Sequence, residues 1–180
     1  EVKLNVFIDA NVPEALIGDP SKLTQVFLNL IGNAIKFVEK GSIDVGVHAS
    51  SKGENITLLM FTIADTGIGI SPENLNHIFE SFKQAEATTH LKYGGSGLGL
   101  SIVKQIIEKA GGNIDVTSEL GTGTTFEFSI PFKIGAADGL ATVNDTHFEI
   151  STQEKEIVRD MRILIFEDNV LYWLLEEPRN

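Results

Sequence analysis

The sequence contains no cysteine and no long apolar run among its 180 residues. Without cysteine, disulfide bonds and thiolate chemistry are both excluded. No stretch approaches the roughly 18 consecutive apolar residues that a membrane-spanning helix requires, and the N-terminus lacks the basic and then apolar pattern of a signal peptide. We therefore expect a chain that makes no membrane contact and that works in the cytoplasm.

Basic residues are also scarce, because 14 Lys and Arg residues stand against 25 Asp and Glu residues and give a formal net charge of −11. A general nucleic-acid binder needs a basic surface to displace counterions, so this charge excludes that class of function. The histidines lack the spacing of metal ligands; they are His48, His77, His90 and His147. An acidic protein that binds a nucleotide needs a divalent cation, which shields the phosphates from the field of the protein.

Glycine is concentrated between Tyr93 and Ser101, where Gly94, Gly95, Gly97 and Gly99 precede apolar residues with the spacing of an amphipathic helix. The first turn of a helix leaves N–H groups unpaired at the positive end of its dipole, and glycine lets an anion approach the backbone. The stretch lacks the Gly-Lys-Ser/Thr ending of a P-loop, and no apolar strand precedes it as in a dinucleotide fold. It predicts a nucleotide site of another kind, and the alternative is a flexible connection.

A helix is predicted over residues 21–39, where apolar residues follow the i, i+3, i+4, i+7 rule and form one buried stripe. Asn29, Asn33 and Lys36 share a different face of this helix, because their spacing is i, i+4, i+7. Asparagine oxygens can hold hydrated Mg²⁺ and a lysine can meet a phosphate, whereas the alternative is a solvated face. Asparagine lowers helix stability, so its use twice in one column favours the functional interpretation.

Residues 56–64 are almost wholly apolar and predict a central strand covered on both faces, which runs into Asp65-Thr66-Gly67-Ile68-Gly69. An aspartate at this place either forms the turn or acts as a fixed acceptor. As an acceptor, Asp65 could take a hydrogen bond from an amino group such as adenine N6.

The remaining patterns predict strands over residues 2–9, 42–49, 113–118 and 124–131, a loop over 11–20, a helix N-cap at Asp19, a short helix over 73–83 and a polar cover over 84–92. Helices grouped on one face of a mixed sheet are the economical packing for this order of elements. We therefore predict an α+β fold of two layers. The composition divides the chain into a domain over 1–133, a linker over 134–160 and a separate segment over 161–180 that begins with a compact apolar strand.

Four motifs in order resemble the ATP-binding catalytic domain of sensor histidine kinases, within the wider family of gyrase, Hsp90 and MutL ATPases. They are Asn29-Leu30-Ile31-Gly32-Asn33-Ala34-Ile35-Lys36-Phe37, Asp65-Thr66-Gly67-Ile68-Gly69, Phe79-Glu80-Ser81-Phe82 and Gly95-Ser96-Gly97-Leu98-Gly99-Leu100. The resemblance covers Glu1 to about Phe132 and implies a Bergerat-type fold.

The resemblance also implies the roles of site residues. Asn29 would hold Mg²⁺ and, with Lys36, act at the phosphates, while Asp65 would accept from the adenine amino group and Thr124 would lie close to it. The full set expected to bind ATP is Asn33, Asp65, Gly67, Gly69, Lys92, Gly95, Ser96, Gly97, Leu98, Gly99, Leu100 and Thr124. Leu91 stands where related hybrid kinases often have arginine, which leaves Lys92 as the nearest cation.

By the same resemblance, the domain transfers the γ-phosphoryl of ATP to a histidine on a separate dimerisation domain, and a receiver domain is the further partner. Residues 161–169 are similar to the first strand of a receiver, with acids at Glu167 and Asp168, but the strand that carries a phosphorylatable aspartate is missing. No phosphoacceptor pattern precedes the domain, and a chain that starts at Glu1 without methionine indicates a fragment. Membrane attachment of the full protein is left open.

Two rival functions come from other classes. A nucleotide-sensing module would regulate a partner through nucleotide binding, without phosphotransfer. An ATPase of the gyrase or Hsp90 kind needs a hydrolytic glutamate in the asparagine helix, where Gln25 stands one turn before Asn29.

Overall fold

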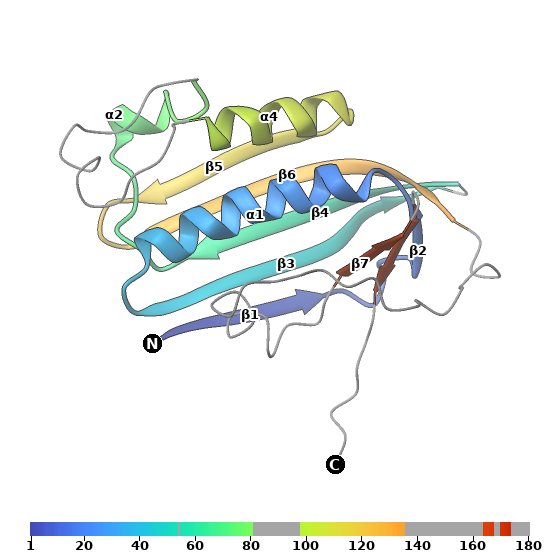
Figure 1. The fold of residues 1–180 in the computed structure, drawn as a ribbon, viewed down its shortest axis with the longest axis horizontal. Helices are drawn as coiled ribbons and strands as arrows, with labels where there is room; N and C mark the ends of the chain where they lie inside the picture. Colours follow the sequence, from blue (N-terminus) through green and yellow to red (C-terminus); the bar gives the residue numbers. More distant parts are fainter. Residues whose placement is uncertain (54, 81–97, 136–163, 168–169, 174–180) are drawn as a thin grey trace, which may run out of the picture.

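The computed structural model describes residues 1–53, 55–80, 98–135, 164–167 and 170–173 of the chain. Within them, eight strands form one mixed sheet, and the two long helices lie together on one face of it (Figure 1). The predicted α+β class, with helices on one face of a mixed sheet, is confirmed.

The long helices begin and end near the predicted residues. Helix α1 spans Pro20–Phe37, and the side chain of Asp19 caps it by accepting a hydrogen bond of 3.1 Å from the N–H of Lys22. Helix α4 spans Gly99–Lys109. Of the short helix expected over residues 73–83, the described residues contain α2 (Pro72–Leu75), followed by turns over residues 76–79 and a bend at residue 80; residues 81–83 lie outside the described residues.

The centre of the sheet consists of β3 (Gly41–Lys52), β4 (Ile56–Asp65) and β6 (Gly123–Ile134), paired in antiparallel register. Strand β1 (Val2–Ile8) lies parallel to β3 at one edge, and β5 (Asn113–Glu119) pairs with the first half of β6. The sequence predicts all of these strands, β4 from its continuous apolar run and the others from alternation. Strands β3 and β6 continue past their predicted ends at residues 49 and 131.

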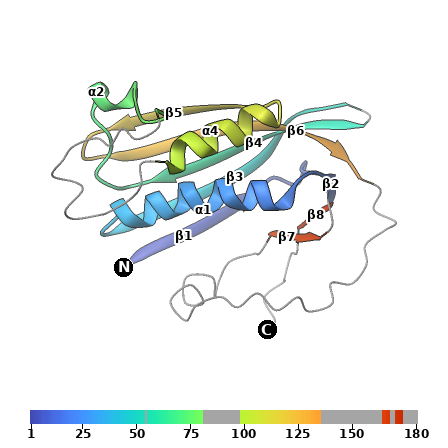
Figure 2. The same cartoon turned by 45° about the horizontal axis from the view of Figure 1, so that its top comes forward.

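The predicted loop over residues 11–20 is wrong in part, because it contains the strand β2 (Ala15–Ile17). Three residues are too few to show a period in the sequence. Strand β2 pairs with the end of β6 and, on its other side, with β8 (Val170–Trp173), which pairs with β7 (Leu164–Glu167). Figure 2 shows β7 and β8 beside β2, at the end of the sheet where α1 begins. The linker and receiver interpretations of residues 134–180 stay predictions.

An aromatic contact holds α1 against the sheet. The rings of Phe61 in β4 and Phe128 in β6 stack with centroids 4.6 Å apart and an interplanar angle of 11°. Phe27 of α1 meets both rings edge-on, at centroid distances of 5.8 and 6.1 Å. Because both sheet rings are buried, this contact joins the helix to the two central strands.

The two faces of β4 are covered unequally. Leu59, Phe61 and Ile63 are buried beneath the helices, whereas Leu58 and Met60 on the opposite face are half-buried. The sequence predicts a central strand covered on both faces. Among the described residues the long helices α1 and α4 both lie on one face, so the cover of the other face stays a prediction.

We predict that Phe128→Ala lowers the free energy of unfolding by about 3–5 kcal/mol, because it opens a cavity beneath α1. Urea denaturation measures the change. The control is Leu28→Ala on the outer side of α1, where the leucine side chain is 70% exposed. It should change stability by less than about 0.5 kcal/mol. Equal losses in the two variants would contradict the assignment of the core.

Candidate nucleotide-binding site

The carboxylate of Asp65 is held at the end of β4 by backbone groups. Its Oδ1 accepts a hydrogen bond of 2.8 Å from the N–H of Gly67, and the N–H of Thr124 also donates to this side chain. A Cβ atom on Gly67 would lie 2.7 Å from Oδ1 of Asp65 and 2.8 Å from the carbonyl oxygen of Phe37. The turn after β4 therefore touches both the carboxylate and the end of α1.

Burial raises the pKa of the Asp65 carboxyl above its ordinary value, and the hydrogen bonds from the N–H groups of Gly67 and Thr124 offset part of this increase. The side chain is half-buried. An ionised carboxylate has about four acceptor positions, so two backbone donors leave capacity for a ligand. Asp65 is thus an oriented acceptor, and its side chain also forms the turn. The sequence left these two roles open as alternatives, and the geometry is consistent with both.

The glycine turn after Asp65 lies directly on the β5–β6 turn. The N–H of Gly121 donates to the carbonyl oxygen of Ile68 at 2.7 Å, and the N–H of Ile70 donates to Oγ of Ser118 at 2.8 Å. Gly69 has a φ of +69°, and a Cβ atom there would collide with the carbonyl oxygen of Glu119. This close approach explains the glycine at position 69 and gives one wall of the site.

Asn29 of α1 faces the start of α4. Its Nδ2 donates a hydrogen bond of 2.8 Å to the carbonyl oxygen of Gln25, so the other carboxamide atom, Oδ1, points away from the helix backbone. A Cβ atom on Gly99 would lie 2.7 Å from this Oδ1. Glycine at the first residue of α4 therefore lets the Asn29 oxygen and the end of α4 meet.

The start of α4 has features of an anion site. The N-cap residue Leu98 has no side chain that can cap the helix, and the hydroxyl of Ser101 donates to the carbonyl oxygen of Leu98 at 2.9 Å instead of accepting from the first turn. Leu98, Gly99 and Leu100 are half-buried beside α1. The N–H groups in the first turn of a helix lie at the positive end of its dipole and attract a negative group.

The polar face of α1 connects these two regions. Asn29 meets the start of α4, and the carbonyl oxygen of Phe37, two turns further along, meets the turn after Asp65. Asn33 and Lys36 lie between them, both half-buried, and the ammonium of Lys36 sits 5.1 Å from the centroid of the Phe37 ring. A ligand with a negative end and an amino group at the other end would match this arrangement.

The structure brings together many of the predicted site residues. They form two groups, the first with Asn29, Leu98, Gly99 and Leu100, and the second with Asp65, Gly67, Gly69 and Thr124. Lys92, Gly95, Ser96 and Gly97 lie outside the described residues. Ser118 and Gly123 were missed. Gly123 has a φ of +134° and its Cβ atom would collide with the carbonyl oxygen of Asp65; the two glycines of the Gly-Thr-Gly turn were the available signal.

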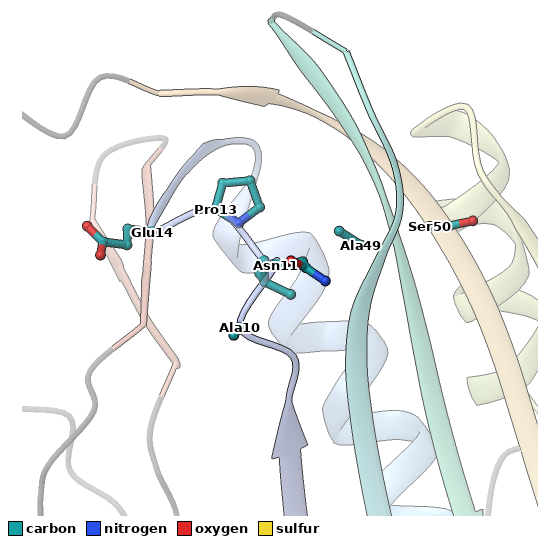
Figure 3. A pocket seen from close by; sticks show the side chains of 7 residues that line it. Ala10, Asn11, Pro13, Glu14, Ala49 and Ser50 are labelled. Atoms are coloured by element: carbon teal, nitrogen blue, oxygen red, sulfur yellow. The ribbon is translucent and has the colours of Figure 1, made fainter.

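Two hollows in the described surface lie away from this site. One, of about 490 Å³, is lined by residues 10–14 together with Ala49 and Ser50 (Figure 3). The β3–β4 register pairs Ala49 with Leu59 but Ile43 with Asp65, so this hollow is at the opposite end of the sheet. The other, of about 530 Å³, lies between the start of α1 and the end of α4. Neither contains a residue predicted to bind a nucleotide.

Comparison with known proteins decides the family. Residues 18–134 match the family described as histidine kinase-, DNA gyrase B- and HSP90-like ATPases. The chain belongs to this family. The matched range contains both residue groups of the site. It therefore includes the Asn29 helix, the Asp65 turn and the start of α4. Within the described residues, no helix is both long and apolar enough to cross a membrane.

Curated relatives within the family are much longer proteins. Over 128 residues the chain is 44% identical to the hybrid signal transduction histidine kinase B of Dictyostelium discoideum, covering 71% of this chain and 6% of that protein. It is 42% identical over 136 residues to the autoinducer 2 sensor kinase/phosphatase LuxQ of Vibrio cholerae, covering 74% and 16%. It is 40% identical over 129 residues to the signal transduction histidine-protein kinase BarA of Escherichia coli, covering 72% and 14%.

Solved structures of histidine kinases share the family fold. Full-length ShkA in complex with AMPPNP aligns with a TM-score of 0.64 and 35% identity, over 76% of this chain and 27% of that one. The mycobacterial sensor histidine kinase MprB aligns with a TM-score of 0.54 and 30% identity, over 74% and 84%. The second match, which covers most of the other chain, identifies the fold as that of a histidine kinase domain.

We predict that Asp65→Asn raises the free energy of unfolding near pH 7 when no nucleotide is present. The raised pKa means that the folded state binds this proton more tightly than the unfolded state, so the contribution of Asp65 to stability is largest in acid. That contribution falls as the pH rises through the ordinary aspartate pKa to the raised folded value. Asparagine keeps the acceptor oxygen and removes the buried charge.

Urea denaturation near pH 7 and near pH 4 measures this effect, and the advantage of the Asp65→Asn variant should shrink at the lower pH. Glu127→Gln, at an exposed position of β6, controls for the loss of one negative charge. A variant that is less stable than wild type near pH 7 would contradict the role of burial at Asp65.

Proposed function

We propose that this domain binds Mg²⁺-ATP and transfers its γ-phosphoryl group to a histidine on a separate dimerisation domain, as the catalytic domain of a sensor histidine kinase. The observation that carries the proposal is the span of α1 between the start of α4 and the acceptor Asp65. Triphosphate and adenine occupy opposite ends of this span. The chain covers 6% of the first curated relative, so the acceptor domain and the receiver domain are proposed partners outside it.

Asp65 recognises the base in this proposal. Its carboxylate accepts a hydrogen bond from the 6-amino group of adenine, which a keto group at the same position cannot donate. The turn around Gly67 and Gly69 forms the wall beside the base, because its backbone lies directly against the carboxylate and the β5–β6 turn. Thr124 is the cross-strand neighbour of Asp65 and completes the polar end of the pocket.

Asn29 is the proposed ligand of the metal. Its Oδ1 is an oxygen donor fixed in direction, as Mg²⁺ prefers, and the described residues contain no cluster of three His, Cys, Asp or Glu side chains that could hold a metal without the nucleotide. The ion would therefore be shared between Asn29 and phosphate oxygens. Mg²⁺ supplies charge neutralisation at the triphosphate, which an acidic protein with a net charge of −11 needs.

Positioning supplies the rest of the mechanism. Asn33 and Lys36 follow Asn29 on the same face of α1, where the ammonium stabilises negative charge on the phosphates. The N–H groups of Gly99 and Leu100 bind a phosphate oxygen at the start of α4. Lys92, Gly95, Ser96 and Gly97 stay predicted ligands of ATP. The acceptor histidine belongs to the partner domain, so the isolated chain binds ATP and transfers phosphate poorly.

Hydrolysis of ATP as the main activity is disfavoured by α1 itself. A hydrolytic enzyme needs a carboxylate or an equivalent group to orient the attacking water. Helix α1 contains no aspartate or glutamate between Pro20 and Phe37, and Gln25 contributes only its backbone oxygen to the Asn29 hydrogen bond. The absence of a water-activating acid from α1 is consistent with a domain that transfers the phosphoryl group to a protein acceptor. We propose that this transfer takes place in the cytoplasm.

We predict that Asn29→Ala weakens the binding of ATP at least about tenfold in the presence of Mg²⁺, because a fixed oxygen ligand is lost. Without Mg²⁺, in excess chelator, the same change should have little effect. Isothermal titration calorimetry measures both affinities. Gly32→Ala is the matched control, since it adds a methyl group to an exposed position of α1 that has no atom within 4 Å. An equal loss with and without Mg²⁺ would remove Asn29 from the metal site.

We predict phosphotransfer in trans when the chain is mixed with the histidine-bearing dimerisation domain of its own full-length protein and Mg²⁺-ATP. The product should be acid-labile and alkali-stable phosphate on that domain, measured with radiolabelled ATP. Replacement of the acceptor histidine by alanine is the control. ATP binding without any transfer would favour the nucleotide-sensing module, and rapid phosphate release by the isolated chain would favour the ATPase.

A further inference from the structure

A row of polar side chains crosses three strands beside the proposed base pocket. The register pairs Asp65 of β4 with Thr124 of β6, and Thr124 with Ser118 of β5. Directly paired residues point to the same face of a sheet, so the three side chains lie next to one another on the face that the helices cover. Thr124, in the middle of the row, is only 7% exposed. Ser118 is half-buried.

The hydroxyl of Ser118 has three partners. It donates to the carbonyl oxygen of Gly123 at 2.7 Å, accepts from the N–H of Ile70 at 2.8 Å, and lies 3.0 Å from Oγ1 of Thr124. A hydroxyl has one proton and two acceptor positions. The Gly123 carbonyl can only accept, so the Ser118 proton is committed to it. The N–H of Ile70 takes one acceptor position and leaves one for Thr124.

The number of available protons then determines the direction in which the hydroxyl of Thr124 donates. Because Ser118 has no second proton, Thr124 must donate in the contact between the two hydroxyl groups. The proton of Thr124 is thereby directed toward Ser118, and the atom that remains for a ligand is an oxygen with lone pairs. The pocket presents two acceptors side by side, the Asp65 carboxylate and Oγ1 of Thr124.

We infer that Ser118 is a positioning residue that makes Thr124 an obligatory hydrogen-bond acceptor and thereby biases the pocket toward 6-amino purines over 6-keto purines. This inference rests on the proposed function, since it concerns the same nucleotide site. A threonine hydroxyl that is free to rotate could donate to a keto oxygen. The contact with Ser118 removes that option, so the keto oxygen of a 6-keto base would face two acceptors in this row of side chains and gain no hydrogen bond from Thr124.

The test compares the affinities of ATP and inosine triphosphate, which carries a keto group at position 6, for wild type and Ser118→Ala. Alanine releases the Thr124 proton, so the ratio of ATP affinity to inosine triphosphate affinity should fall about tenfold. Loosening of the turn at Ile70 would lower both affinities together and leave the ratio unchanged. Retention of the wild-type ratio in Ser118→Ala overturns the inference.

A double-mutant cycle with Thr124→Val shows whether Ser118 acts through Thr124. Valine keeps the shape of threonine and lacks the hydroxyl, so Ser118→Ala should not change the ratio further in this background. An equal change in both backgrounds overturns the inference. If Ser118→Ala does not fold, Thr124→Val alone decides: it should weaken ATP binding more than inosine triphosphate binding, and equal effects on the two nucleotides contradict the inference.

The proposed function and this inference fail differently. Wild-type protein that binds neither nucleotide overturns both of them. Wild-type protein that binds ATP, together with a Ser118→Ala variant whose base preference is unchanged, overturns only the role of Ser118. Ser118→Thr restores a hydroxyl at the same position and should restore most of the wild-type ratio.

Discussion

The edge-on contact of Phe27 with the stacked rings of Phe61 and Phe128 determines where α1 lies on the sheet. Aromatic rings fill this part of the core, so the helix cannot slide without losing buried contact with both central strands. Asn29 follows Phe27 by two residues on α1 and therefore lies on a different, nearly opposite side of the helix. A packing interaction in the core thus sets the position of an oxygen that we assign to the metal.

The two ends of the site lie at two places along the polar face of α1. At one end, the carboxamide of Asn29 is turned by its hydrogen bond to Gln25 toward the start of α4. At the other end, the carbonyl oxygen of Phe37 touches Gly67, whose N–H holds Asp65. The site is therefore organised by contacts among α1, α4 and the end of β4, and its two ends have opposite chemistry. This is the physical reason for assigning the phosphates to α4 and the base to Asp65.

Local patterns in the sequence predicted the parts of this structure that depend on neighbouring residues. The apolar stripe predicted α1 and the Asp-Pro pair predicted its cap at Asp19. Alternation of apolar residues predicted most of the strands. The motifs identified Asn29, Asp65 and Gly99 as candidate site residues. The sequence could not show the row of Ser118, Thr124 and Asp65, because it is created by pairing between three strands. It also missed β2, which is too short to have a period, and the apolar run of β4 does not tell which element covers the face away from the helices.

A crystal structure of the domain with Mg²⁺ and a non-hydrolysable ATP analogue would show directly whether α1 links the metal site to the base pocket. We predict one nucleotide that spans α1, with Oδ1 of Asn29 in the coordination shell of the ion and the carboxylate of Asp65 hydrogen-bonded to the adenine amino group. A nucleotide bound elsewhere, for example in the hollow between the start of α1 and the end of α4, would contradict it. So would a nucleotide that reaches only one of these two residues.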